Sequence, residues 1–427
     1  MNTRRLLIVS PHFPPVNAPD MQRVRMSLPY FVTAGWEVTV LTVADPTPIA
    51  PLESELEATV PSGVRVVRAH CFSRRWTGLL GVNNVALRSL PFLFLTGCRL
   101  LTARRHDVVY FSTTMFITLP LGRLWRALCG VPYVIDLQDP WVSDYYERPG
   151  APRPPGGWKY RVTQWTARAL ERWTMRGAAQ LITVSVAYGE SLRARYPELC
   201  TTPCTELPFG SPDPDLQHLR ATLAQRPAML PPDGLRLAFA GALGPGMLPA
   251  VETLFAAMAL IRREGVRVSA HFFGTSYSPS AEGCPATLVL AGKYGLMDCV
   301  HERTDRLRYL DALQVTLEAE ANLLFGSTEL AFTPSKILAV LAAGRPVVAL
   351  APAGSAMTAR LAQLGQACVT FPADGPDAAS VREVAGELRA LAAGQLYDPN
   401  VAAPGLYSAR AVAERQLEIF ATVASCA

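Results

Sequence analysis

The chain has 427 residues, half of them apolar and 18% charged, which predicts a large folded core and excludes global disorder. Its 40 basic and 35 acidic residues give a formal net charge of +5. This excess is too mild for a typical nucleic-acid-binding protein, and it fits an anionic small substrate or a membrane surface better. The length favours two domains.

The cysteines and the N-terminus indicate the compartment. The 9 cysteines are scattered and form no C-x-x-C pair, so neither a zinc site nor a disulfide framework is expected. Scattered free thiols are typical of a reducing compartment. The first residues contain only a short apolar run, which is too short for a secretory signal peptide. We therefore expect a cytoplasmic protein.

The first half of the chain alternates apolar runs with helical stretches. Leu6 to Val9 is expected to be a buried strand, followed by a helix from about residue 20 to 34 and a strand at 37–43. Further strands are expected at 64–69, 107–112, 133–136, 180–184 and 205–207. This alternation predicts a parallel, doubly wound sheet. The loop PHFPPVNAPD has no glycine, which argues against a dinucleotide-binding dehydrogenase.

Polar residues follow the predicted strand YVID. Asp136, Gln138 and Asp139, with Trp141 beside them, stand at the carboxyl end of this strand, where ligands bind in such sheets. A carboxylate here would orient a sugar hydroxyl or act as a base. It would equally well cap a loop or pair with an arginine, and the sequence leaves both interpretations open.

The most apolar segment is VALRSLPFLFLTGCRLLTA, residues 85–103. Arg88, Pro91 and Arg99 interrupt it and leave no uncharged run of 18 residues, so a membrane-spanning helix is not expected. A helix buried against the sheet is favoured over one that lies on an anionic membrane. Trp76 and the arginines at 74, 75, 104 and 105 would support the membrane interpretation.

The second half begins after a proline-dense stretch at residues 224–234, which predicts a domain boundary. A new sheet is expected to start at 235–240 and to continue at 268–274, 299–302, 321–325, 347–350 and 368–371. We predict an α/β protein with two Rossmann-like doubly wound domains, 1–224 and 235–405, that face one another across a ligand-binding cleft. The tail 406–427 is expected to form a helix that packs back on the first domain.

Three segments of the second half suit a nucleotide. The glycine-rich turn at 241–246 would let the backbone approach an anionic ligand, although a plain tight turn has the same pattern. In the stretch 326–350, Thr333 is expected to cap a helix that starts at Pro334. Its free N–H groups, its dipole and Lys336 would then point at a phosphate. Residues 301–306, HERTDR, would hold a nucleobase edge or form a salt-bridged loop.

Five stretches together resemble a known family: IVSPHFPP with Arg23, DLQDPW, QLITVSVAYGESL, FAGALGPG and FTPSKILAVLAAGRPVV. They are similar to the retaining glycosyltransferases of family 4, which have the GT-B fold of two facing Rossmann-like domains. The resemblance implies transfer of a sugar from a nucleotide-diphosphate sugar to a lipid-linked or polysaccharide acceptor, with retention and without a metal or other cofactor. It implies no nucleic-acid partner, and it leaves peripheral contact with the inner face of a membrane open.

The resemblance also implies roles for individual residues. Asp139 and Lys336 are carried over as catalytic, with Lys336 neutralising the leaving diphosphate. The donor-binding residues are Gly241, Leu243, Gly244, Arg303, Glu329, Thr333 and Ser335. The acceptor-side residues are Asn17, Asp20, Arg23, Asp136 and Trp141.

The sequence departs from the family pattern at three places. Ala331 and Ala339 replace its two glutamates, and Glu329 lies two residues from the first of them. Pro245, Gly246 and Met247 stand where the family has an arginine and a lysine, and Asn17 and Ala18 replace paired glycines. These departures keep open a non-catalytic GT-B-like protein that binds a partner or glycan. A sugar-nucleotide epimerase on the same fold is a further alternative.

Overall fold

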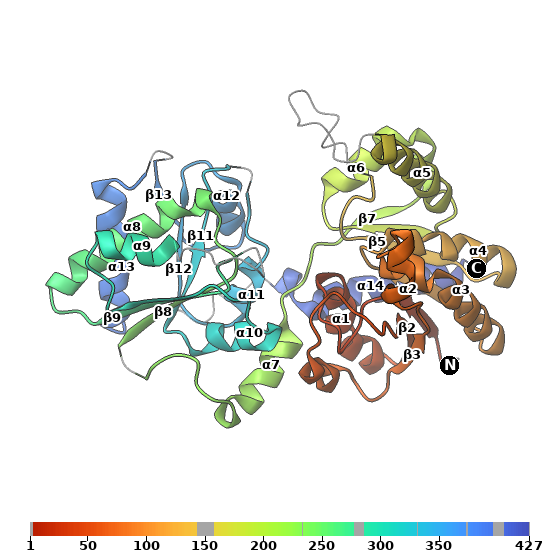
Figure 1. Cartoon of the computed structure of the whole chain (residues 1–427), viewed down its shortest axis with the longest axis horizontal. Coiled ribbons are helices and arrows are strands. Elements are labelled where there is room, and N and C mark those ends of the chain that lie inside the picture. The colour runs from red at the N-terminus through yellow and green to blue at the C-terminus, as the bar shows by residue number, and fades with distance from the viewer. Residues whose placement is uncertain are drawn as a thin grey trace. The chain divides into compact units, whose positions relative to one another are not determined.

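The computed structural model describes residues 3–142, 158–232, 234–276, 286–330, 332–372, 375–395 and 405–426. The chain forms two compact units (Figure 1). The first unit contains Met1–Gly210 together with Ala409–Ala427, and the second contains Ser211–Ser408. Each unit is a parallel sheet with helices on its faces, so the predicted α/β class with two doubly wound sheets is confirmed.

The sheet of the first unit has the strand order β3-β2-β1-β4-β5-β6-β7. Its strands are short and largely buried, as the apolar runs predict for a parallel sheet: β1 (Arg5–Val9), β2 (Glu37–Val43), β3 (Arg65–Ala69), β4 (Val108–Ser112), β5 (Tyr133–Leu137), β6 (Gln180–Thr183) and β7 (Cys204–Glu206). The winding direction reverses between β1 and β4. The loops that follow these two strands therefore flank the crevice where a doubly wound sheet binds ligands.

The helices of this unit are α1 (Gln22–Thr33), α2 (Arg74–Thr77), α3 (Val85–Ala103), α4 (Pro120–Cys129), α5 (Trp158–Met175), α6 (Val186–Arg195) and α14 (Ala409–Ser425). They cover both faces of the sheet, apart from the short α2, which buries no residue. One core joins α1 and α14 to the sheet, and the other joins α3 and α4 to it. Where α3 crosses α4, a Cβ on Gly97 would lie 2.1 Å from the Trp125 ring, so only glycine permits this close packing.

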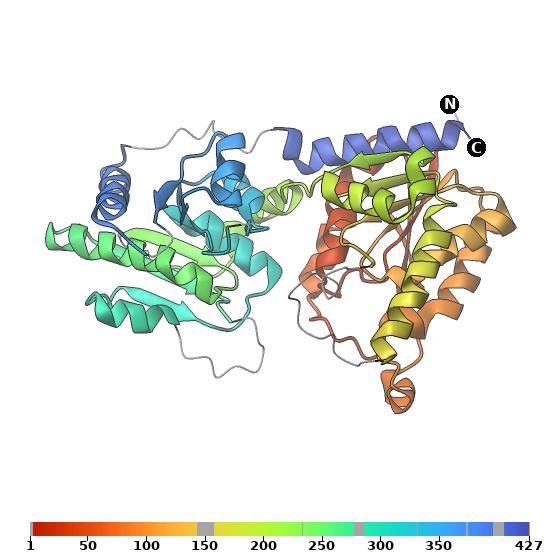
Figure 2. The same cartoon turned by 90° about the horizontal axis from the view of Figure 1, so that it is seen from above.

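The C-terminal helix α14 completes the core of the first unit. Its Phe420 ring lies 5.7 Å from the Phe31 ring of α1 and 4.9 Å from the Tyr110 ring of β4, measured between centroids. Gln416 donates to the Tyr110 hydroxyl and accepts from Ser27. Figure 2 shows α14 lying along the first unit, far in sequence from the strands that it covers. The chain thus leaves the first unit after Gly210 and returns to it at Ala409.

The second unit has the strand order β10-β9-β8-β11-β12-β13. Its strands are β8 (Leu235–Ala240), β9 (Val268–Phe273), β10 (Val300–Arg303), β11 (Ala321–Phe325), β12 (Val347–Pro352) and β13 (Val369–Phe371). Its helices are α7 (Asp213–Thr222), α8 (Leu248–Arg263), α9 (Ala286–Lys293), α10 (Tyr309–Glu318), α11 (Ile337–Ala342), α12 (Ala356–Gln363) and α13 (Ala378–Ala392). Here the winding reverses between β8 and β11.

The domain boundary differs from the predicted position at residue 224. The helix α7 belongs to the second unit, because the Tyr309 hydroxyl of α10 donates to Asp215 at 2.8 Å. Arg220 donates to the carbonyl of Ala342, and Arg226 pairs with Asp311 at 2.6 Å. The prolines at 224–234 therefore mark a loop within the second unit, and the chain crosses between the units near Gly210.

Two stretches of the described helices, Val85–Ala103 and Pro245–Arg263, have the length and hydropathy of a membrane span. Both bury one face against a sheet, with Leu93 and Leu101 of α3 and Leu254 and Met258 of α8 fully or almost fully enclosed. The predicted packing of residues 85–103 on the sheet is confirmed.

Candidate functional site

Two loops meet at the carboxyl edge of the second sheet, at the point where its winding reverses. Gly241 follows β8 with a φ of 143°, a backbone conformation that favours glycine. The loop after β11 joins it, because the Thr328 N–H donates to the Gly246 carbonyl at 2.9 Å. A Cβ on Gly246 would lie 2.4 Å from the Ser327 hydroxyl oxygen. Glycine is therefore required for these loops to approach one another so closely.

Lys336 reaches this junction from the loop before α11. Its Nζ donates to the Ala240 carbonyl at 2.9 Å and lies 3.3 Å from the centroid of the Phe239 ring. A Cβ on Gly241 would stand 2.7 Å from the same nitrogen, so the glycine turn and the lysine are in contact. Desolvation lowers the pKa of Lys336 to about 7. No ion pair within the described ranges includes this amine, so its charge remains available to an anion.

The predicted helix start at Thr333 and Pro334 is wrong. The helix α11 begins at Ile337 and has six residues, with Lys336 as its N-cap residue and no capping side chain. The Ile337 N–H donates to the Pro334 carbonyl, so residues 334–337 form a turn that precedes the helix. Serine, threonine and proline favour turns as well as helix starts, which explains the error. Such a short helix adds little dipole to the site, and Lys336 provides the main positive charge.

The other predicted donor-binding residues differ in their contacts with this junction and in their exposure. The Leu243 N–H donates to the Thr275 carbonyl at 3.0 Å, and this bond connects the 241–244 turn to the loop after β9. Glu329 is exposed, and its N–H donates to the Ser327 hydroxyl. Thr333 and Ser335 are exposed beside Lys336. Ala331, one of the positions that depart from the family, lies outside the described residues.

Arg303 stands on the same edge of the sheet, farther from Lys336. Arg303 on β10 pairs in register with Phe273 on β9, and Phe273 pairs in register with Ala240 on β8. Arg303 and Ala240 are therefore two strands apart, which corresponds to roughly 10 Å. Its neighbour Glu302 accepts from Thr275 and from the Thr287 N–H, and so anchors the start of α9. The 301–306 segment is therefore partly structural, with Arg303 left exposed.

In the first unit, a histidine and an aspartate occupy the carboxyl edge where the winding reverses. The Asp20 carboxylate accepts from His12 Nδ1 at 2.9 Å, from the Thr113 hydroxyl at 2.7 Å and from the Thr114 N–H at 3.3 Å. Burial raises the pKa of Asp20, but these bonds and the nearby imidazole outweigh it and leave the pKa lowered. His12 was not assigned a role from the sequence, although its position directly after β1 was a usable signal.

His12 and Asp20 line a cavity of about 380 Å³. Residues of the loops after β1 and β4 form part of its wall, including Val16 and Met115. Asp45 and Arg88 also line it, and the Arg88 guanidinium donates to both carboxylate oxygens of Asp45 at 3.0 and 2.5 Å. The remaining lining is mainly apolar: Pro48, Ile49, Ala50 and Val85. The cavity thus combines an imidazole–carboxylate pair with a mainly apolar lining.

Four of the five predicted acceptor-side residues do not line this cavity. Arg23 and Asp136 are buried and form an ion pair, with Nε 3.3 Å from Oδ2, and Asp136 also accepts from Tyr110 and Ser112. Asn17 donates to Glu53, and Trp141 stacks on Phe116. Asn17, Arg23 and Asp136 are buried in these contacts and Trp141 is partly buried, so their contact with an acceptor stays a prediction. For Asp136, the structure shows the alternative in which the carboxylate pairs with an arginine.

Asp139 is exposed just beyond β5, on the same edge as Asp20. Partial burial and the charge of Asp20 raise the pKa of Asp139. Burial and the charge of Asp139 in turn raise the pKa of Tyr188 on α6. Asp139 is therefore close enough to both groups to interact with them electrostatically.

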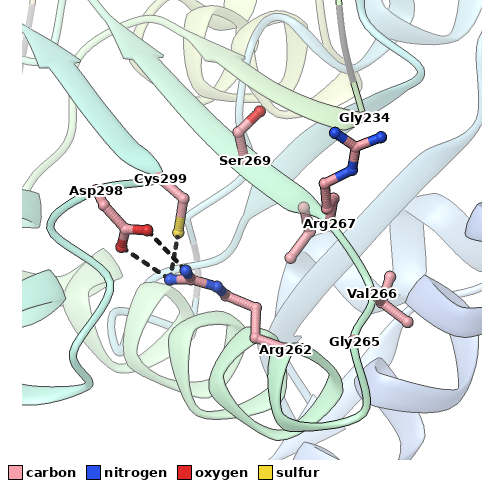
Figure 3. A pocket seen from close by; sticks show the side chains of 9 residues that line it. Gly234, Arg262, Gly265, Val266, Arg267, Ser269, Asp298 and Cys299 are labelled. Carbon is pink, nitrogen blue, oxygen red and sulfur yellow. Dashed lines mark hydrogen bonds and ion pairs between the residues drawn. The ribbon is translucent and has the colours of Figure 1, made fainter.

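A second cavity, of about 340 Å³, lies at the opposite edge of the second sheet (Figure 3). Arg262 donates to both carboxylate oxygens of Asp298 and to the Cys299 sulfur there. These groups surround the amino ends of β9 and β10, whereas Gly241 and Lys336 stand at the carboxyl ends. This cavity is therefore separate from the loop junction.

Across the ranges that the structure describes, no three histidine, cysteine, aspartate or glutamate side chains gather in a group that could hold a metal ion.

Comparison with known proteins gives a partial family match and a shared fold. Residues 22–201 match the model of the Glycosyl transferase 4-like domain. The sequence matches none of the curated proteins with which it was compared.

Several solved structures resemble the whole chain. Sucrose-phosphate synthase from Thermosynechococcus elongatus is 16% identical, with a TM-score of 0.57 over 99% of this chain and 100% of its own. Anabaena HepE in complex with UDP and glucose is 15% identical, with a TM-score of 0.52 over 98% and 100%. A putative UDP-N-acetylglucosamine 2-epimerase from Listeria monocytogenes is 13% identical, with a TM-score of 0.53 over 97% and 95%. These likenesses show the fold, which is the GT-B fold expected from the sequence.

Proposed function

We propose that this protein is a glycosyltransferase that moves a sugar from a nucleotide-diphosphate sugar to a hydroxyl of a lipid-linked or polysaccharide acceptor. One observation carries the proposal: the Lys336 amine contacts the Gly241 turn at the winding reversal of the second sheet. The partial match to the glycosyltransferase domain over residues 22–201 supports it. A solved structure of the same fold also holds UDP and glucose.

The donor would bind at the loop junction of the second unit. Gly241 and Gly246 let Lys336 and the Ser327 and Thr328 hydroxyls approach the backbone of the turn closely, and these groups together would bind the diphosphate. Protonated Lys336 would stabilise the negative charge that develops on the leaving diphosphate, without a metal ion. Exposed Arg303 would contact the nucleoside, and exposed Glu329 would bind sugar hydroxyls.

The acceptor would occupy the cavity beside His12. Because the Asp20 carboxylate holds Nδ1 of the imidazole, Nε2 is the nitrogen left to accept a proton from an acceptor hydroxyl. In a retaining reaction the leaving phosphate takes that proton, and His12 would then only orient the hydroxyl. The His12–Asp20 pair also favours a second route, in which His12 acts as the base and the sugar inverts.

Product analysis distinguishes these routes and the alternatives. NMR of the anomeric centre of the product reports retention or inversion directly. His12→Gln is expected to lower kcat by about 100-fold if His12 is the base and to change mainly KM if it only orients the acceptor. Conversion of the donor without any acceptor would instead identify an epimerase.

Calorimetric titration with UDP and a panel of sugar nucleotides tests the proposal itself. Micromolar to millimolar binding that Lys336→Ala weakens by at least about tenfold is expected, because a charge-assisted contact to the diphosphate is lost. Lys293→Ala is the matched control, since Lys293 is an exposed lysine paired with Glu252 in the same unit. The absence of any nucleotide binding at millimolar concentration would contradict the proposal and leave a non-catalytic binding protein as the better explanation.

A further inference from the structure

A long segment of the first unit carries one sign of charge only. Residues 58–106 contain eight arginines and no aspartate or glutamate, although an even spread of the 35 acidic residues of the chain would place about four there. The segment includes β3, α2, the 3-10 helix η3 (Gly78–Leu80) and α3. Arg68, Arg88 and Arg104 pair with acidic residues from outside it. Within the described part of the chain, Arg74, Arg75 and Arg99 are exposed and take part in no ion pair.

Large apolar side chains stand exposed beside these arginines. Trp76 on α2 is 76% exposed and Leu79 on η3 is 82% exposed. On α3, Leu87, Pro91 and Leu95 are exposed at intervals of four residues, and Arg99 continues the same stripe. We call this set the basic apolar face, and it consists of Arg74, Arg75, Trp76, Leu79, Leu87, Pro91, Leu95 and Arg99.

This face is not the packing surface of α3. The opposite side of α3 buries Leu93, Gly97 and Leu101 against α4 and the sheet. α2 and η3 directly precede α3 in the chain, and in Figure 1 α2 lies at the front of the first unit. The packing of α3 on the core therefore leaves the exposed stripe uncovered, and core packing does not explain its apolar residues.

We propose that the basic apolar face docks the protein on the surface of an anionic lipid bilayer. Arginines attract anionic headgroups, and tryptophan and leucine enter the boundary between headgroups and acyl chains. A polyanion such as nucleic acid would use the arginines but would not account for the exposure of Trp76 and Leu79. A bilayer uses both kinds of side chain at once.

The basic apolar face lies next to the cavity that holds His12, so docking would bring this cavity to the membrane surface. Val85 and Arg88, in the first turn of α3, line the cavity that holds His12, and Leu87 lies between them on the exposed side. If the proposed transferase function holds, a docked protein would present this cavity close to the headgroups of a lipid-linked acceptor. Docking itself does not depend on that function.

Vesicle flotation tests the proposal with the full-length protein. Vesicles of phosphatidylcholine mixed with phosphatidylglycerol are expected to bind the protein, whereas vesicles of phosphatidylcholine alone are not, and added salt is expected to weaken binding. Arg74→Gln with Arg75→Gln is expected to reduce binding by about fivefold for each arginine, or about 25-fold together. Trp76→Ser with Leu79→Ser is expected to reduce it at least as much.

Matched controls separate this face from general surface properties. Arg263→Gln, Arg267→Gln and Val289→Ser change exposed residues of the second unit and are expected to leave vesicle binding unchanged. Trp76→Phe is expected to retain binding while it loses the quenching of tryptophan fluorescence by brominated lipid. Thermal unfolding of every variant should match that of the parent, because each side chain is exposed.

Three results would overturn the proposal. The parent protein could fail to bind anionic vesicles, it could bind neutral vesicles equally well, or the Trp76 and Leu79 double variant could bind like the parent. Binding to heparin that depends on Arg74 and Arg75, without vesicle binding, would show a polyanion surface in place of a lipid one. Nucleotide titration of the same variants reports separately on the donor site, so failure of docking and failure of the transferase proposal are distinguishable.

Discussion

At the scale of single residues, the proposed chemistry depends most on Lys336. Its amine contacts a carbonyl oxygen and the face of an aromatic ring, and burial lowers its pKa to about 7. A diphosphate would favour the charged amine and raise this pKa in the complex. Donor binding should therefore be strong below pH 7 and weaken as the free amine loses its proton above pH 7.

This linkage gives a pH-dependent prediction. The affinity for UDP is expected to fall by about fivefold between pH 7 and pH 8, because the charged fraction of the free amine falls by about that factor. Calorimetric titrations at several pH values measure it. Lys336→Met should bind UDP weakly at every pH and show a flatter profile, with Lys293→Met as the control. An equally steep profile in Lys336→Met would assign the titration to another group.

The same burial predicts an effect on stability. The folded-state pKa lies below the unfolded value of 10.5, so the charged amine destabilises the fold below pH 7, and the penalty disappears as the pH rises from 7 to 10.5. Lys336→Met is therefore expected to raise the free energy of unfolding at pH 6 by about 2 kcal/mol and to have little effect at pH 10. Denaturant titrations at both pH values measure this. Loss of stability at pH 6 would show that the ring and carbonyl contacts of Lys336 outweigh its desolvation.

The sequence predicted where strands end more accurately than it predicted the direction in which side chains point. Asp136 was placed correctly at the end of a strand, but its side chain points into the unit and pairs with Arg23. In a parallel strand that is buried on both faces, apolar periodicity does not show which residues face which side. His12 lines the cavity, and its place in the loop three positions beyond β1 was a signal that the sequence interpretation did not use.

At the scale of elements, the strands follow the predicted apolar runs, whereas the helix predicted to start at Pro334 starts later. The stretch TPSK contains the residues of a helix cap, but the local turn from Pro334 to Ile337 delays α11. Gly344 follows the C-cap of this helix with a φ of 69°, the left-handed conformation in which glycine commonly ends a helix. Proline density likewise did not mark the boundary, because α7 and the loop after it are bound to α10 by side-chain contacts that local sequence does not encode.

The junction of the loops after β8 and β11 predicts a specific requirement for glycine. In Gly246→Ala, the new Cβ would meet Ser327 and Thr328 oxygens at 2.4 and 3.0 Å and force the loops apart. UDP affinity is expected to fall at least about tenfold, because the donor groups lose their alignment. Gly386→Ala in α13 is the control, since a Cβ there meets nothing within 4 Å. Unchanged UDP binding in Gly246→Ala would place the donor elsewhere on the second unit.

At the scale of the whole molecule, the first unit is discontinuous in sequence. Its core closes only when α14 packs on α1 and β4, after the entire second unit has been synthesised. The second unit is built from one continuous stretch, Ser211–Ser408, and contains all the proposed donor groups. The two units should therefore respond differently to changes in the C-terminal helix and to nucleotide.

Calorimetric unfolding can test this difference with one substitution and one ligand. Phe420 is fully buried against Phe31, Trp36 and Tyr110, so Phe420→Ala is expected to destabilise the first unit by about 3–4 kcal/mol. Saturating UDP should raise the melting temperature of the second unit, since it binds only the folded form. The exposed Glu418→Ala on the same helix is the control. If Phe420→Ala shifts the transition that UDP stabilises, then α14 supports the donor-binding unit as well, and the two units do not unfold independently.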